Sequence, residues 1–90
     1  MTDVRDNKAR SRFELDIDGH VAFANYRATP QGVIITHTET PLPLRGRGIG
    51  SQLVEGALTL IRADGSRVIA GCSFVADYLR DHPENRDITA

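Results

Sequence analysis

The feature that most constrains the fold is a change in hydrophobic period between residues 39 and 49. Before it, Phe13, Leu15 and Ile17 alternate with acidic residues, the pattern of a half-buried strand. After it, apolar residues from Ile49 to Ile61 recur at the spacing of an amphipathic helix. A chain of 90 residues has room for one domain with a single two-layer core. The sequence therefore predicts an α+β domain in which strands come first and a helix packs on them.

Turn signals divide the first half into three strands. Asp18-Gly19 is typical of a type I′ hairpin, which needs positive φ at both central positions. The second strand is expected over His20–Ala28, and Thr29-Pro30-Gln31-Gly32 is a second turn. The β-branched run Val33–Thr38 follows as a third strand. These segments predict an antiparallel three-stranded meander, preceded by a flexible tail over residues 1–11, so that the single domain spans residues 12–90.

The second half is predicted to be a β-α-β crossover followed by a short C-terminal helix. Pro41 and Pro43 end the third strand, and Asp64-Gly65 ends the long helix. A short strand is expected over Arg67–Cys72 and a second helix over Phe74–Asp81, stopped by Pro83. The helix is long enough to place its two flanking strands parallel. Residues 84–90 are expected to be a polar end.

Charge and cysteine content exclude several classes of function. The formal net charge is −1 and the arginines form no stripe with aromatic residues, so neither nucleic acid nor a membrane surface is an expected partner. The single cysteine, Cys72, excludes an internal disulfide and a multi-cysteine metal site. No metal is predicted. With no secretory signal and one free thiol, we expect a cytoplasmic protein, present as a monomer or a weak homodimer.

The chemistry is predicted at the glycine-rich turn between the third strand and the long helix. The first amides of a helix have no intrahelical acceptor, and the helix dipole adds positive potential there. Glycines at 46, 48 and 50 leave the backbone accessible to an anion, while Arg45 and Arg47 add charge. Ile49 and Ser51 complete the turn, and Ser51 adds a hydroxyl. A diphosphate is the expected ligand, and the alternative is a flexible turn that binds nothing.

Two other phosphate-binding motifs fit less well. A dinucleotide-binding fold places its glycine turn after the first strand and repeats its βαβ units. In this chain the turn follows the third strand, and there is one βαβ unit. A nucleotide-hydrolysing P-loop needs Gly-Lys-Ser/Thr after its spacer, which is absent from the sequence.

Arg45-x-x-Gly48-x-Gly50 resembles the R/Q-x-x-G-x-G/A signature of the GCN5-related N-acetyltransferases. Two further stretches are similar to a subgroup of about ninety residues, the small YjdJ-type N-acetyltransferase-like proteins, at a length matching this chain. They are His37-Thr38-Glu39 before the turn, and Cys72-Ser73-Phe74-Val75, Tyr78 and His82-Pro83-Glu84 after it. The chain departs from the subgroup at Ser73, where proline is usual, and at Asn85, where an aromatic residue often follows Pro-Glu.

The resemblance implies a minimal acyl-CoA N-acyltransferase (GNAT-like) fold with acetyl-coenzyme A (acetyl-CoA) as co-substrate. The coenzyme would lie in a V between two parallel strands, one ending near Glu39 and the other near Cys72. Thr38-Glu39-Thr40 would face the pantetheine arm, and the amides of residues 46–51 would hold the pyrophosphate. The acceptor would be an amine of a small molecule or an exposed amine of a protein, on an open side of the domain.

Four residues are catalytic candidates, each with a structural alternative. By resemblance, Glu39 is placed as the general base, or it is a solvated strand-end carboxylate. His37 shares a strand face with Glu39 and either relays a proton, packs against the helix or makes a hydrogen bond. Cys72 either carries the acetyl group as a nucleophile or lines the pantetheine channel. Tyr78 either protonates the leaving thiolate, as the resemblance implies, or packs in the core.

Two functions remain open from the sequence. One is an N-acetyltransferase that uses acetyl-CoA, and the other is an acyl-CoA-binding regulatory module with little or no turnover. They share the phosphate turn and differ in whether an acceptor amine reaches the thioester.

Overall fold

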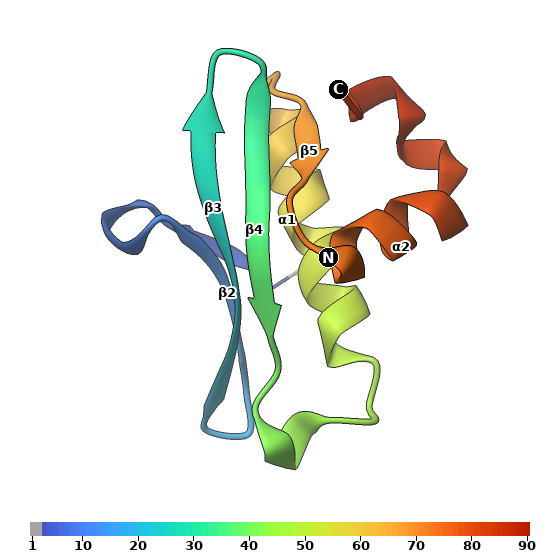
Figure 1. Ribbon diagram of the computed structural model, residues 1–90. Coiled ribbons are helices and arrows are strands. Elements are labelled where there is room, and N and C mark those ends of the chain that lie inside the picture. Colours follow the sequence, from blue (N-terminus) through green and yellow to red (C-terminus); the bar gives the residue numbers. More distant parts are fainter. Residues whose placement is uncertain (1–2) are drawn as a thin grey trace.

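The computed structural model describes residues 3–90 and shows one five-stranded mixed sheet with helices packed against it (Figure 1). The strands follow the sheet in chain order. They are β1 (Arg5–Asn7), β2 (Arg12–Ile17), β3 (His20–Thr29), β4 (Gly32–Glu39) and β5 (Val68–Ala70). The first four are antiparallel neighbours, and β5 lies parallel to β4. Asp18 and Gly19 both have positive φ, 53° and 78°, so the predicted hairpin conformation is confirmed.

The helix α1 (Ile49–Ala63) covers one face of the sheet and contacts β1 to β4. Its apolar side is buried against sheet residues that alternate along β2 and β3, such as Phe13, Leu15, Ala22 and Ala24. The helical spacing of the sequence therefore gives the helix and its buried face correctly. The helix and the sheet together enclose the hydrophobic core that fixes the turn before α1.

The helices α2 (Ser73–Asp81) and η3 (Pro83–Ile88) lie beside β5 (Figure 1). The expectation of a merely polar end after Pro83 is wrong for this segment. Asn85 and Ile88 are buried, and Asp87 accepts a hydrogen bond from Arg62 of α1 at 2.9 Å. Thr89 then forms a parallel bridge with Val68, beside β5. Two buried residues within a polar run are too weak a pattern to reveal such an element.

The expectation of a loose tail over residues 1–11 is wrong for residues 4–10, and residues 1–2 lie outside the described residues. Val4 is 6% exposed, β1 pairs with β2, and a 3-10 turn, η1 (Lys8–Arg10), follows. Arg5 forms ion pairs with Glu14 and Asp16 of β2. An edge strand held by ion pairs and one apolar residue lacks the alternation that identifies a strand in a sequence.

The strand expected over Arg67–Cys72 is shorter, because the chain leaves the sheet at Gly71. A Cβ at Gly71 would lie 2.7 Å from Ile34 Cγ2 and 2.8 Å from the Ile35 carbonyl oxygen, so only glycine fits this close crossing.

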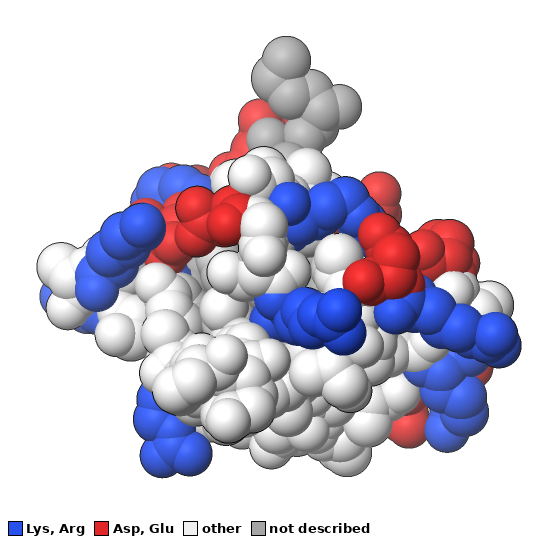
Figure 2. Space-filling model, turned by 90° about the horizontal axis from the view of Figure 1, so that it is seen from above, with Lys and Arg blue, Asp and Glu red and all other residues white. Residues whose placement is uncertain are grey.

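Among residues 3–90, no helix is both long enough and apolar enough to cross a bilayer. Figure 2 shows acidic and basic side chains interspersed at the end of the molecule seen from above.

Candidate acetyl-CoA site

The turn before α1 takes its shape from two glycines with positive φ. The short 3-10 helix η2 (Leu42–Leu44) ends at Arg45, and Gly46 and Gly48 follow with φ of 81° and 73°. Gly48 is the N-cap of α1, and no side chain caps this helix end. A Cβ added at Gly46 or Gly48 meets no protein atom within 4 Å. These glycines are therefore required by the backbone conformation, and they leave open space above the turn.

The first amides of α1 are available to a ligand. The first intrahelical bond runs from Gln52 N–H to the Gly48 carbonyl at 3.1 Å. Within the described chain, the N–H groups of Ile49, Gly50 and Ser51 have no hydrogen-bond acceptor. A helix of 15 residues adds its dipole at the same place. This arrangement of unpaired donors and positive potential is suited to an anion such as a phosphate group.

A cavity of about 210 Å³ lies over these amides. Its lining contains most of the predicted coenzyme-binding residues together with two apolar ones: Thr40, Leu44, Arg45, Gly46, Gly48, Ile49, Gly50, Ser51 and Phe74. The structure thus brings the turn residues and Thr40 into one cavity. Thr38, Glu39 and Arg47, which were also predicted for the coenzyme, do not line it.

Phe74 is a part of this site that the sequence analysis missed. The side chain is 42% exposed, and its ring lies over Gly50. A Cβ at Gly50 would lie 2.8 Å from the ring, so this glycine is required for packing against Phe74. The only signal in the sequence was the position of Phe74 two residues after Cys72, at the start of α2. The contact brings the N-terminal ends of α1 and α2 together.

Both arginines of the turn already have a partner. Arg45 Nε donates to the Thr40 carbonyl oxygen at 3.0 Å, which connects the turn to the end of β4. Arg47 Nη1 lies 2.8 Å from Asp18 Oδ2 in the hairpin between β2 and β3. Both members of the Arg47–Asp18 pair are exposed, so the pair is weak and Arg47 is free to exchange partners.

The strands β4 and β5 pair over only three residues each, Val33–Ile35 with Val68–Ala70. The last contact is from Gly71 N–H to the Ile35 carbonyl at 2.9 Å. At Thr36 the pairing with β3 contains a bulge, because Asn25 lies opposite His37 and Tyr26 opposite Ile35. From Thr36 to Glu39, β4 continues without a parallel partner in the described chain, which leaves this edge open beside the turn.

His37 and Glu39 lie on the sheet face opposite α1. Glu39 is directly across from Phe23, whose neighbours Ala22 and Ala24 point into the core. His37 Nε2 is 3.2 Å from Glu39 Oε1, and both side chains are about half exposed. The prediction that the two share a face is confirmed, as is the hydrogen bond. The alternative that His37 packs against the helix is wrong, because the bulge keeps it on the outer face.

Cys72 and Tyr78 take different places on α2. Cys72 is the half-buried N-cap of α2, where the chain leaves β5. Tyr78 is buried between α1 and α2, stacked on His82 at 3.9 Å between ring centroids. Burial, and then Glu55 and Glu84, raise the pKa of Tyr78. Tyr78 lines a separate cavity of about 260 Å³, so it is not in the cavity over the phosphate turn.

The fold and the site together define a small acyltransferase-like domain with an uncapped glycine turn between a helix and a parallel strand pair that separates after three residues. The family model of the GCN5-related N-acetyl-transferases matches residues 12–88, and the chain belongs to this family. A solution structure of a GCN5-like protein from Staphylococcus aureus is similar, with a TM-score of 0.69 and 22% identity. The match covers 98% of this chain and 87% of the other. No curated protein is significantly similar in sequence.

Within residues 3–90, no three His, Cys, Asp or Glu side chains come together in a way that would hold a metal ion.

Proposed function

We propose that this protein binds acetyl-CoA by its pyrophosphate at residues 46–51 and transfers the acetyl group to an amine. The observation that carries the proposal is the set of three unpaired amides, of Ile49, Gly50 and Ser51, beneath the cavity over the turn. Membership of the N-acetyltransferase family supports the choice of acetyl-CoA among diphosphate ligands. Arg45 and Arg47 would add hydrogen bonds to the phosphate oxygens.

The pantetheine arm would run from this turn along the open edge of β4. Thr38 and Glu39 belong to the stretch of β4 without a parallel partner, so their backbone groups on that side would be free to bond the two amides of the arm. Thr40 follows this stretch, and its carbonyl oxygen already accepts from Arg45 Nε, so its N–H is the group it would offer. The arm would pass between β4 and the start of α2, which brings the thioester toward Cys72.

The acceptor amine would approach from the sheet face opposite α1, where His37 and Glu39 lie exposed. In a direct transfer, Glu39 or the His37–Glu39 pair takes a proton from the ammonium, and the neutral nitrogen attacks the thioester carbon. The C–S bond then breaks and the coenzyme leaves as a thiolate that must gain a proton. In this proposal Tyr78 would need another residue or water to carry that proton, because it lines a different cavity.

A two-step route through Cys72 is the alternative mechanism. The Cys72 thiol would lose its proton and attack the thioester carbon, and the C–S bond to coenzyme A would break, its sulfur taking up a proton in place of the one lost by Cys72. The neutral amine would then attack the acetyl-cysteine, its proton would pass to the departing Cys72 sulfur, and the free thiol would be restored. We expect Cys72→Ala to abolish the acetyl adduct seen by intact mass after incubation with acetyl-CoA, if this route is used. An unchanged transfer rate in the same variant would assign Cys72 to lining the channel, with Ser73→Ala as the matched control.

The function itself is tested by calorimetry with acetyl-CoA and by thiol release in the presence of a panel of amines and lysine peptides. We expect saturable binding and thiol release above the hydrolysis rate with at least one amine. Absence of binding would overturn the proposal, and binding without transfer to any amine would replace it by an acyl-CoA-binding module.

We also propose a cytoplasmic location, because the free thiol of Cys72 favours a reducing compartment.

A further inference from the structure

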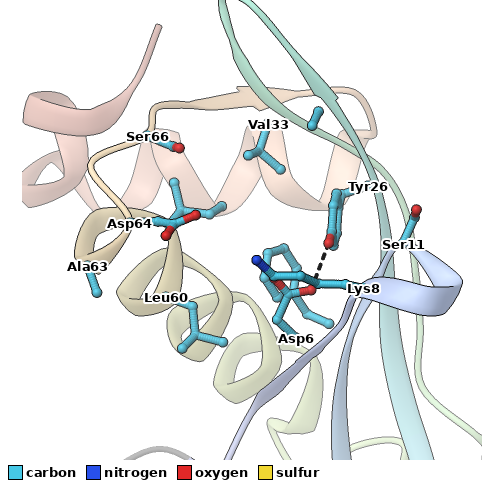
Figure 3. Close-up of a pocket in the computed structure, with 12 residues that line it drawn as sticks. Asp6, Lys8, Ser11, Tyr26, Val33, Leu60, Ala63, Asp64 and Ser66 are labelled. Carbon is cyan, nitrogen blue, oxygen red and sulfur yellow. Dashed lines mark hydrogen bonds between the residues drawn. The ribbon is translucent and has the colours of Figure 1, made fainter.

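A second and larger cavity opens between the sheet and the C-terminal half of α1, at the opposite end of this helix from the phosphate turn. Its volume is about 600 Å³, which is in the usual range for small-molecule sites. Figure 3 shows Asp6, Lys8 and Tyr26 on one side of it and Leu60, Asp64 and Ser66 on the other. None of its lining residues is shared with the cavity over the turn.

The inner wall of this cavity is apolar. Phe13 and Tyr26 lie with ring centroids 4.7 Å apart and present a continuous aromatic surface. Val33, Leu60 and Ile61 complete the wall from β4 and α1. Such a surface favours the hydrocarbon or aromatic part of a ligand.

Two carboxylates lie at the polar side, and both can accept further hydrogen bonds. Asp6 Oδ1 accepts from the Tyr26 hydroxyl at 2.7 Å, which leaves the other carboxylate oxygen available. Asp64, the C-cap of α1, has no ion pair or side-chain hydrogen bond within the described chain. Burial, the hydrogen bond to Asp6 and the charges of Asp6 and Asp64 raise the pKa of Tyr26 to about 12. Tyr26 therefore stays protonated and acts as the donor that orients Asp6.

The charge balance of the cavity favours a cation. The C-terminal end of α1 contributes partial negative charge beside Asp64. Lys8 is the one cationic lining residue; its side chain extends into the cavity from η1, and it forms no ion pair within the described residues (Figure 3). Lys8 is exposed, so a ligand can displace its ammonium group at little cost.

We propose that this cavity binds a small organic cation, with a primary ammonium group held by Asp6 and Asp64 and an apolar body against Phe13, Val33 and Leu60. Lys8 forms no ion pair with either carboxylate, so its exposed side chain would turn away to admit the ligand. This site is independent of acetyl-CoA binding, since it lies at the other end of α1.

The test is an amide NMR titration of the whole chain with phenylethylamine, and in parallel with the neutral phenylethanol and the anionic phenylacetate. We expect saturable shifts at residues 6–11 and 60–66 with the amine, and affinity about tenfold weaker for the alcohol, since a charge-assisted hydrogen bond is worth roughly that factor. Phenylacetate should bind least. No saturable shift in these segments with the amine, or equal affinity for all three compounds, would overturn the proposal.

Three variants sharpen the result. Asp64→Asn should weaken amine binding about tenfold, whereas Asp77→Asn, which removes the same charge from the exposed face of α2, should leave it unchanged. Lys8→Gln should tighten binding of the amine, because a competing cation is removed. An Asp64→Asn protein that is folded by its amide spectrum and binds the amine as tightly as the parent would contradict the assignment.

Discussion

The two ends of α1 have similar glycines but differ in whether their backbone amides are hydrogen-bonded within the protein. Gly48 before the helix and Gly65 after it both have φ of 73°, and a Cβ at either position meets nothing within 4 Å. At the C-terminal end, the amides of Asp64, Gly65 and Ser66 all donate to helix carbonyls. At the N-terminal end, the amides of Ile49, Gly50 and Ser51 have no acceptor within the described chain.

Gly65 therefore belongs to a helix end whose backbone groups are paired within the protein, whereas Gly48 belongs to a helix end whose amides are available to a ligand. After Ala63 the chain completes the helix with its own amides, as helix C-termini commonly do. Before Ile49 no side chain caps the helix, since the N-cap residue Gly48 has none to accept from the first turn. An uncapped helix end under an open cavity is the physical basis of the proposed acetyl-CoA site.

The largest expected effect is that of a negative charge at the open end. Gly48→Glu should lower the affinity for acetyl-CoA by about 100-fold or more, because its carboxylate would repel the diphosphate and compete for the same amides. Calorimetry measures the affinity, and circular dichroism checks the fold. Gly65→Glu adds the same charge at the same φ to the other end of α1 and should bind the coenzyme normally. Equal losses in the two variants would contradict the account.

A smaller substitution separates the cost of backbone strain from the loss of binding. Gly48→Ala and Gly65→Ala each place a Cβ in the left-handed region, so each should lower the free energy of unfolding by about 1–2 kcal/mol. Only Gly48→Ala should also weaken acetyl-CoA binding, by about tenfold, because its methyl group enters the ligand space. Urea unfolding and calorimetry on both variants give the two quantities. An affinity loss in Gly65→Ala would show that strain alone explains the effect.

The smallest expected effect concerns the ion pair between Arg47 and Asp18. Asp18→Asn frees Arg47 and removes a carboxylate near the phosphate turn, while asparagine tolerates the φ of 53° at this position. Affinity for acetyl-CoA should rise about two- to threefold, with a weaker effect at high salt. Asp87→Asn, which breaks the Arg62 pair far from the turn, is the control. A lower affinity in Asp18→Asn would mean that the pair positions Arg47 for the ligand.

The sequence predicted the parts of the fold that have a strong local signal. The change from strand to helical hydrophobic period predicted α1, and Asp18-Gly19 predicted the first hairpin with positive φ at both residues. It also predicted a glycine turn before the helix, on the ground that glycines leave the amides accessible to an anion. The structure adds that Gly46 and Gly48 have positive φ, which favours glycine at both positions. The family followed from the same motif, and the family match confirms it.

The remaining features depend on contacts between distant segments, which no local pattern records. The edge strand β1 is held by Arg5 with Glu14, and η3 by Asp87 with Arg62, so neither has the apolar alternation that identifies an element. The reason for Gly50 also differs from the one expected, because its neighbour is the Phe74 ring rather than open space alone. The cavity at the other end of α1 has lining residues from four stretches of the chain, within residues 6–13, 26–28, 33 and 60–66, and was not predicted.

The central claim is that acetyl-CoA places its diphosphate on the open N-terminal end of α1. An amide NMR titration of the whole chain with acetyl-CoA tests it most directly. We expect the largest shifts at Gly46, Gly48 and residues 49–51, with the signals of residues 64–66 unchanged. Binding that shifts residues 64–66 and leaves residues 46–51 unchanged, or no saturable shift at all, would contradict it.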